Sequence, residues 1–352
     1  MELTRRDQEV LGAVVTDYIQ TGEPVGSRII AKRYGLKVSS ATIRNVMSDL
    51  EDLGFLQQPH TSAGRVPTEK GLRFYLDSIM QFKALEQDER ALIRQAFKNV
   101  EPDVREMLQR ATGVLSRVCR QAGVVLWPKL SGTRVKHIEC IRLRPHQIMV
   151  ILISETGLVH HRLVEWEEDI GQNDLDRYSS FLNELLEDVP LGEVKQRILD
   201  EMHNEKRSFD QLYARALEMT RRFVQATLEN SEIYIEGQTH LLNNPEFAHV
   251  ERMRRMLKAF EEKSRIIRLL DMTMEGSSGV QIVLGSESDL TDLGEISLIS
   301  SPYRRGDSLM GVLGVIGPIR MDYSRIIPVV EFTAGLLSEM LEDQEDLEPI
   351  RS

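Results

Sequence analysis

The segment Ser39–Arg73 constrains this chain more than any other part of the sequence. Serines precede a run of apolar residues at helical spacing, and Gly54 stops that run. Two short segments containing proline follow, Phe55–Pro59 and Arg65–Pro67, and their prolines are typical of an edge hairpin. A helix, a hairpin and a further helix that starts after Thr68 predict the recognition helix and wing of a winged helix-turn-helix.

The residues before this segment complete the expected domain, because they provide two more short helices with glycine-containing turns. The three expected helices start at Thr4, with Asp7 completing a capping box, at a cap from Ser27, and at a cap from Ser39 or Ser40. The third expected helix, Ser40–Leu53, is the recognition helix. We therefore expect residues 1–82 to form a winged helix-turn-helix domain.

The outer face of the third helix carries the chemistry that reads DNA. Its apolar residues face inward, which leaves Thr42, Arg44 and Asn45 outside. Arginine donates two hydrogen bonds to guanine and asparagine pairs with adenine, so these three are the candidates for base contacts. Arg65 is expected near the tip of the wing, against phosphate or the minor groove. The candidate DNA-binding residues are Arg28, Lys37, Ser39, Ser40, Thr42, Arg44, Asn45, Ser48, His60, Thr61, Ser62 and Arg65. Winged helices also serve as protein-interaction modules, which is the alternative reading of this domain.

The charge distribution agrees with a local DNA-binding module. The net charge is −11, but residues 1–80 are balanced and residues 81–352 carry the whole excess of acid. The segment Pro24–Ser48 contains no acidic residue and five basic ones, and Leu53–Thr68 also contains no acid. A basic face on an acidic protein is the electrostatic signature of nucleic-acid binding, although an ordinary solvated surface can look similar.

Composition and length indicate a soluble, multidomain protein of the reducing cytoplasm. The chain has 352 residues, 41% of them hydrophobic and 28% charged, which is enough for two or three domains. Its longest apolar runs are too short to span a bilayer, and its N-terminus lacks the apolar core of a signal peptide. Cys119 and Cys140 lie among apolar neighbours and are expected to be buried thiols.

The remaining residues predict a mixed helix and strand architecture. Two groups of strands, within residues 124–164 and 280–317, flank a mainly helical block. This order predicts one α+β domain interrupted by an insertion. The expected boundaries are 83–189 and 276–345 for the interrupted domain, 190–275 for the insertion and 346–352 for an acidic tail.

Catalytic, cofactor and metal motifs are not recognisable in the sequence. Gly276–Gly279 is one residue short of a nucleophile-elbow motif. His160 and His161 are adjacent on an expected strand, so their side chains point to opposite faces and cannot share one metal ion. The glycines of Gly311–Gly317 lie in an apolar strand and not at a helix N-terminus, so phosphate binding is not expected there. We therefore expect neither enzymatic activity nor a cofactor.

The N-terminal motif resembles one family closely. The strings LTRRDQEVLGAVVTDYIQTGEPVGS and SSATIRNVMSDLEDLGFLQQPHTSAGRVPTEKGLRFYLD are similar to the HrcA family of heat-inducible transcription repressors. The most specific part is His60–Ala63 followed by Gly64–Pro67, and the dense similarity covers about residues 3–80. The resemblance implies a GAF-like domain with an inserted dimerisation domain.

The same resemblance implies a function and its partners. It implies a cytoplasmic bacterial homodimer that binds an inverted-repeat operator in double-stranded DNA and blocks chaperonin and chaperone operons until heat shock. It further implies that the chaperonin keeps the repressor active. Two other hypotheses stay open on the sequence alone: a winged-helix regulator gated by a small ligand in the GAF-like domain, and an enzyme or signalling protein that carries a winged helix.

Overall fold

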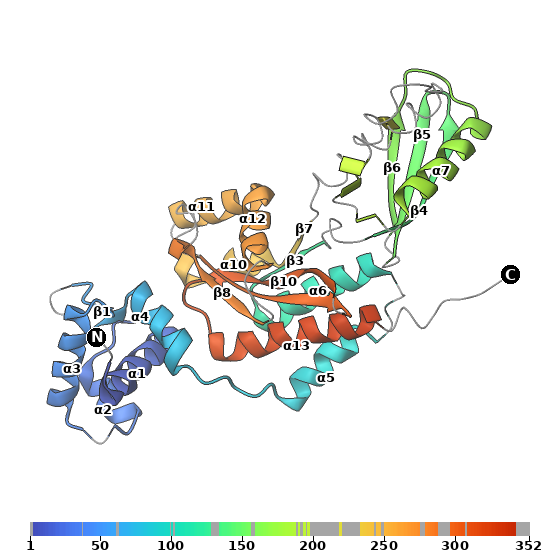
Figure 1. Ribbon diagram of the computed structural model, residues 1–352. Helices are drawn as coiled ribbons and strands as arrows, with labels where there is room; N and C mark the ends of the chain where they lie inside the picture. Colours follow the sequence, from blue (N-terminus) through green and yellow to red (C-terminus); the bar gives the residue numbers. More distant parts are fainter. Residues whose placement is uncertain are drawn as a thin grey trace.

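The computed structural model has three parts along the chain (Figure 1). They are the winged helix (residues 3–79), a core domain around a five-stranded sheet (residues 87–126 and 233–342) and an inserted domain around a three-stranded sheet (residues 134–197). The structure describes residues 3–342 except 37, 61–62, 99, 101–102, 128–133, 156–158, 188, 191–192, 195, 198–217, 220–232, 243, 248–249, 275–278, 288–295 and 307. Among the described helices, none has the length and apolar character needed to cross a membrane.

The N-terminal domain is a winged helix, as predicted. Its helices are α1 (Arg5–Thr21), α2 (Ser27–Arg33) and α3 (Ser40–Asp52). Thr4 and Asp7 form the predicted capping box of α1. Gly26 occupies the N-cap of α2, so the prediction that Ser27 caps this helix is wrong; Ser27 is its first residue.

Two close backbone approaches fix the wing against the helices. The wing pairs β1 (Leu56–Gln57) with β2 (Val66–Pro67), and α4 (Glu69–Phe74) follows and continues as a π-helical turn, η1 (Tyr75–Ile79). A Cβ atom at Gly64 would lie 2.4 Å from the carbonyl oxygen of Val25, and one at Gly71 would lie 2.0 Å from that of Phe55. Both positions therefore require glycine for the wing and α4 to pack as they do.

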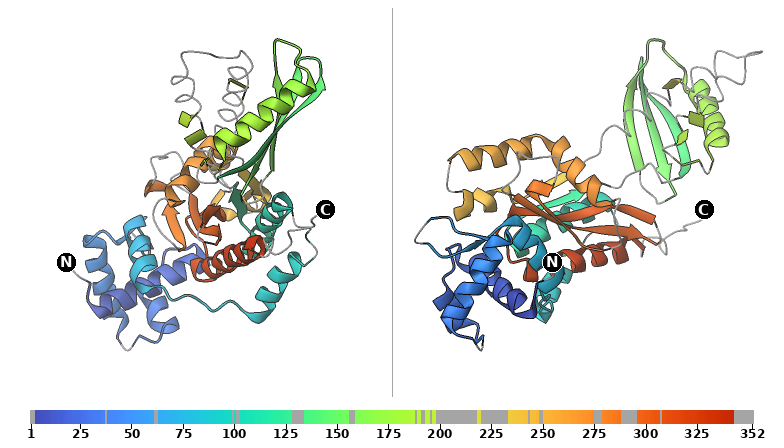
Figure 2. Two further views of the ribbon diagram at one scale, coloured as in Figure 1. Left: turned by 45° about the vertical axis from the view of Figure 1, so that its right-hand side comes forward. Right: turned by 60° about the vertical axis from the view of Figure 1, so that its left-hand side comes forward.

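The core domain is an antiparallel sheet with helices on both faces (Figure 2). Its strands occur in the order β7 (Ile233–Glu236), β3 (Ala122–Leu126), β10 (Ser308–Pro318), β9 (Ile296–Arg305) and β8 (Gln281–Leu284). Helices α6 (Val104–Cys119) and α13 (Tyr323–Glu342) cover one face, with α5 (Gln87–Ala96) beside them. The other face carries α10 (Gln238–Leu242), α11 (Val250–Glu261) and α12 (Lys263–Met274).

The inserted domain leaves the core domain after β3 and returns to it at β7. It pairs β4 (Val135–Arg144), β5 (Gln147–Ser154) and β6 (Val159–Glu165), and α7 (Gln172–Leu186) covers one face of this sheet. On β5 the even-numbered residues are buried and the odd-numbered ones are half-buried, which is the pattern of a sheet covered on one side.

This topology corrects the predicted domain boundaries. The strands of residues 135–165 were expected in the interrupted domain, but they form a sheet of their own. Residues 233–274 were expected in the insertion, but β7 pairs with β3, and Phe247, Phe260 and Leu270 belong to the buried cluster on the five-stranded sheet. Alternating apolar residues mark a strand without naming its partner, so the sequence could not assign each strand to a sheet. The predicted acidic tail, 346–352, lies outside the described residues.

The two adjacent histidines of β6 face opposite sides of the sheet, as predicted. His161 is exposed, whereas His160 is half-buried and its Nε2 atom has no hydrogen-bond partner among the described residues. Burial, together with the positive charge of Arg105, lowers the pKa of His160 to about 4. Its ring packs edge-on against Trp127, at 6.4 Å between centroids.

We expect His160 to make the protein less stable in mild acid. An unfolded histidine has a pKa of about 6.5, so the unfolded chain binds this proton more tightly and stability falls as the pH drops from about 6.5 towards 4. The loss between pH 7 and pH 5 should be about 2 kcal/mol for this one group. Urea unfolding followed by tryptophan fluorescence should show that His160→Leu removes this part of the pH dependence, whereas His161→Leu does not. Equal pH dependence in wild type and His160→Leu would contradict the assignment.

Candidate nucleic-acid interface

The outer face of α3 presents the residues predicted to contact bases. Arg44, Asn45 and Ser48 are exposed, Thr42 is half-buried, and the opposite face packs into the domain through its apolar residues. Among the residues that the structure describes, none forms an ion pair or a side-chain hydrogen bond with Arg44 or Asn45. In Figure 1, α3 lies on the side of the winged helix remote from the core domain. Its outer face is therefore open to a large partner such as DNA.

The N-terminus of α3 is capped by a serine, as predicted, and its hydroxyl groups take part in the cap. Ser39 is the N-cap, and its Oγ atom accepts a hydrogen bond from the Thr42 N–H at 3.1 Å. The Ser39 and Thr42 hydroxyls are also within hydrogen-bond distance of each other, at 3.0 Å. These two side chains stabilise the helix start, which offers partial positive charge to a phosphate. Ser40 is half-buried as the first residue of α3.

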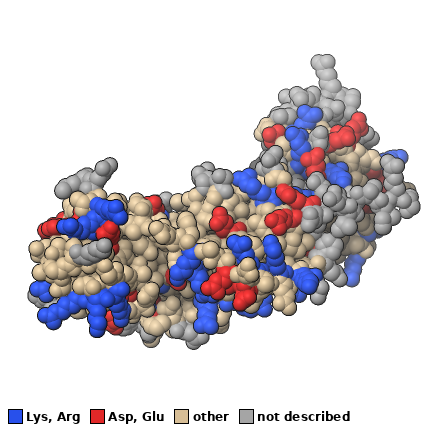
Figure 3. Space-filling view, turned by 90° about the horizontal axis from the view of Figure 1, so that it is seen from below, with Lys and Arg blue, Asp and Glu red and all other residues tan. Residues whose placement is uncertain are grey.

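Cationic side chains lie on α2, which packs against α3. Arg28 and Lys32 are exposed on α2, and Arg28 makes no ion pair with any described residue. Arg33 differs, because its Nη1 atom donates a 2.6 Å hydrogen bond to the buried carboxylate of Asp17 on α1. Figure 3 shows Lys and Arg side chains gathered at the end of the molecule that the winged helix forms. Lys37, another candidate for phosphate contact, lies outside the described residues.

Arg65 does not lie at the tip of the wing, so its predicted position is wrong. Its backbone pairs with Val25, through hydrogen bonds of 2.8 and 2.9 Å, at the base of the hairpin. Its guanidinium forms an ion pair with Glu51 of α3 at 2.7 Å, and only 21% of the Arg65 side chain is exposed. An arginine neutralised by a neighbouring carboxylate is a weaker phosphate ligand. Sequence reasoning missed this pairing because Glu51 is 14 residues away along the chain.

We expect Arg65→Ala to act on the position of the wing and not on the number of phosphate contacts. The salt dependence of DNA binding should then stay nearly unchanged, because each lost phosphate contact lowers the salt slope by about one unit. Filter binding at several salt concentrations measures this slope, and Glu51→Ala serves as the matched variant that breaks the same ion pair. A salt slope that drops by a full unit for Arg65→Ala, but not for Glu51→Ala, would show that Arg65 does contact a phosphate.

The tip of the wing is the loop between Gln58 and Arg65. Gln58 closes it by donating a 3.0 Å hydrogen bond from Nε2 to the carbonyl of Ala63, and His60 is exposed. Two other candidates, Thr61 and Ser62, lie outside the described residues.

One residue of the candidate interface was missed from the sequence. Ala41 is exposed and precedes Arg44, Asn45 and Ser48 by three, four and seven positions, so it shares their face of α3. A methyl side chain in the major groove contacts the thymine methyl group. The helical spacing could have identified Ala41, but only polar side chains were considered as candidates, and Ala41 has none.

The described part of the core and inserted domains does not group side chains into a metal centre. Among the described residues, no three His, Cys, Asp or Glu side chains lie together in a way that could hold a metal ion. Cys119 and Cys140 are buried, as predicted, and burial raises the pKa of the two thiols to about 12 and about 11. Gly311, Gly314 and Gly317 lie within strand β10, as predicted.

Comparison with protein families gives two matches that together span most of the chain. Residues 2–76 match the model described as "Winged helix-turn-helix transcription repressor, HrcA DNA-binding". Residues 105–327 match the model described as "HrcA protein C terminal domain".

Similar proteins match over nearly the full length. A heat-inducible transcription repressor HrcA of Syntrophobacter fumaroxidans is 73% identical over 342 residues, covering 97% of this chain and 98% of its own. One from Geobacter sulfurreducens is 45% identical over 343 residues, covering 97% and 99%. A solved structure titled as a hypothetical protein shares the fold, with a TM-score of 0.59, 24% identity and coverage of 97% and 99%.

Proposed function

Because this chain belongs to the HrcA family of heat-inducible transcription repressors, we propose that it is a homodimer that binds an inverted-repeat operator and releases it on heat stress. The observation that carries the DNA-binding part is the outer face of α3, where Arg44, Asn45 and Ser48 are exposed and lie remote from the core domain. We assign base contacts to Thr42, Arg44 and Asn45, and phosphate contacts to Arg28 and the N-terminus of α3. The operators proposed are those of chaperonin and chaperone operons in the cytoplasm.

The inserted domain offers a surface for the second subunit. The face of its sheet opposite α7 carries six apolar side chains, two of which, Val159 and Leu163, are 55% and 50% exposed. The six are Ile141, Met149, Ile151, Ile153, Val159 and Leu163. The register makes Ile141, Met149 and Leu163 neighbours across the three strands and pairs Ile153 with Val159, whereas Ile151 lies between Glu139 and His161. An exposed apolar patch of this kind on a folded domain marks an interaction site, and we propose that a second copy covers it.

One edge of the same sheet, strand β4, is less suited to pairing with another chain. Side chains of α7 occupy the backbone groups along β4: Asn183 accepts from the Ile138 N–H at 2.7 Å, and Ser179 accepts from that of Cys140 at 2.9 Å. Gln172 accepts from the Arg142 N–H at 2.8 Å. Because these donors are satisfied, β4 has little capacity for strand addition, so this edge is a poor dimer contact.

A dimer provides a physical route to heat release. Each winged helix has one recognition helix and reads one half-site, so tight binding depends on joining two of them. Heat that unfolds the region joining the subunits would release the operator even if each winged helix stayed folded. From the family resemblance alone, we also propose that the chaperonin maintains the active repressor.

A footprint on the organism's own chaperone promoters tests the proposal. Protection of an inverted repeat by the purified protein, lost on heating and strengthened by added chaperonin, is the expected result. Absence of any protected site would reject DNA binding. Protection that appears only with a small metabolite would favour the ligand-gated regulator.

A further inference from the structure

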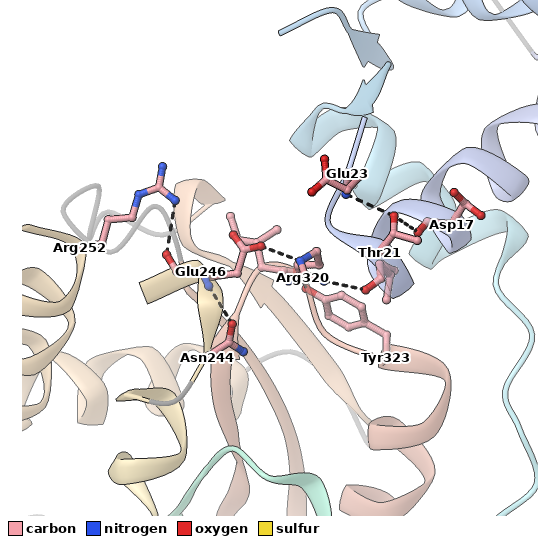
Figure 4. A network of polar contacts seen from close by, with 10 residues as sticks. Asp17, Thr21, Glu23, Asn244, Glu246, Arg252, Arg320 and Tyr323 are labelled. Carbon is pink, nitrogen blue, oxygen red and sulfur yellow. Dashed lines mark hydrogen bonds and ion pairs between the residues drawn. The ribbon is translucent and has the colours of Figure 1, made fainter. Parts of the chain in front are cut away.

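An arginine of the core domain attaches the winged helix by a hydrogen bond to the end of α1 (Figure 4). Arg320 lies in the loop between β10 and α13, and its Nη1 atom donates a 3.1 Å hydrogen bond to the carbonyl of Ile19. Its Nε atom donates at 2.6 Å to Glu246, which belongs to the core domain. Arg320 therefore joins a carbonyl in the last turn of α1 to a carboxylate of the core domain, and a cation is favoured at a helix C-terminus.

The end of α1 is shaped to receive this arginine. Gly22 caps α1 in the left-handed conformation, with φ of 73°. A Cβ atom there would lie 3.1–3.3 Å from the three nearest atoms of the Arg320 guanidinium. Glycine thus satisfies both the backbone conformation and the close approach of the side chain.

A second arginine makes the opposite connection, from the winged helix into the core domain. Arg73 of α4 donates from Nη2 to the carbonyl of Ile282 in β8 at 2.9 Å, and from Nε to Glu287 at 2.6 Å. Partial burial alone would raise the pKa of Glu287, but hydrogen bonds from Arg73 and from the Leu284 N–H hold it below its ordinary value. The carboxylate therefore stays ionised opposite the arginine.

The surfaces around the first anchor are not closely packed. A cavity of about 230 Å³ lies between the winged helix and the core domain, and Arg320 is part of its wall. Tyr18 and Leu72 line it from the winged helix, and Phe247 and Ile319 line it from the core domain. Since tight packing is interrupted here, the polar anchors carry much of the orientation of the winged helix.

We propose that Arg320 and Arg73 are positioning residues that fix the winged helix on the core domain and so determine which spacing of the two half-sites the dimer accepts. Helix α3 packs against α1, which Arg320 holds, and α1 also contacts α4, which carries Arg73. A fixed orientation of α3 in each subunit fixes the distance and the angle between the two recognition helices. Each base pair added between half-sites rotates one of them by about 34–36° and shifts it by about 3.4 Å, so a rigid pair of modules rejects a wrong spacer.

The inference rests on the proposed function, because it needs a dimer that binds two half-sites. It is tested with Glu287→Ala and Glu246→Ala, since these carboxylates belong to the core domain. Removing a negative charge should by itself strengthen binding to DNA. Loss of an anchor predicts the opposite on a whole operator: affinity falls roughly tenfold, because the effective concentration of the second module drops.

The measurement compares three DNAs by gel shift: a half-site, the natural operator, and operators whose spacer is changed by one or two base pairs. Half-site affinity should change less than about twofold in either variant, which also shows that the winged helix is folded. The preference for the natural spacer should fall roughly tenfold. Arg73→Ala should match Glu287→Ala, and the double variant should be no worse than either. Glu251→Ala is the control, because Glu251 pairs with Arg254 within α11.

The possible results distinguish a failure of the positioning role from a failure of the proposed function. A wild-type protein that binds neither the half-site nor the operator would reject the proposed function. If wild type binds both DNAs, an unchanged spacer preference in both carboxylate variants overturns the positioning role. A loss on half-site and operator alike overturns it too, because the anchors would then act within the winged helix itself.

Discussion

Leu163→Asp should lower affinity for the whole operator by roughly 10²–10⁴-fold and leave half-site affinity unchanged. The substitution places a charge on the exposed apolar face of the inserted domain, beside Met149 of β5. Because Leu163 is 50% exposed, the change should cost the folded monomer little. A charge buried in the dimer contact without a partner would instead keep the subunits apart. Gel shifts on whole and half operators, with sedimentation to give the subunit number, measure the effect.

Asn173→Asp is the matched control for this experiment. It adds the same charge at an exposed position of α7 in the same domain. This variant should stay dimeric and bind the operator as wild type does. A Leu163→Asp protein that remains a dimer with full operator affinity would remove the sheet face from the dimer contact.

Arg44→Ala should weaken specific binding by about 1–3 kcal/mol and relax discrimination at one base pair of each half-site. The side chain is exposed on α3 and engages no described carboxylate, so it is available to a guanine edge. Affinity for random DNA should change much less. Competition binding against operators substituted one base pair at a time identifies the position that loses its preference.

A comparison with Arg28→Ala distinguishes base reading from phosphate contact. Arg28 is exposed on α2 and is proposed to contact phosphate, so its removal should weaken binding to all sequences alike and lower the salt slope. If Arg44→Ala reduces affinity equally on operator and random DNA, Arg44 contacts only phosphate.

Local pattern determined most of the winged helix. The capping box at Thr4, the Ser39 cap and the Thr68 cap all occur where the sequence predicted them. Such features depend on residues three or four positions apart, so they can be recognised without a structure. The apolar face of α3 follows the same periodicity, which is why its exposed face was also predictable. Most of the strands outside the winged helix were found as well, from their alternating and β-branched residues.

Only the tertiary structure decided which distant segments meet. It paired Arg65 with Glu51, assigned β4–β6 to a sheet of their own and joined β3 to β7 across the insertion. It also brought Arg320 to the end of α1, 301 residues away from Ile19. Periodicity and caps report local backbone geometry, whereas ion pairs and strand partners depend on the path of the whole chain. The sequence by itself thus determined helix α3, its exposed face and its class of domain, and the fold determined what holds that helix in place.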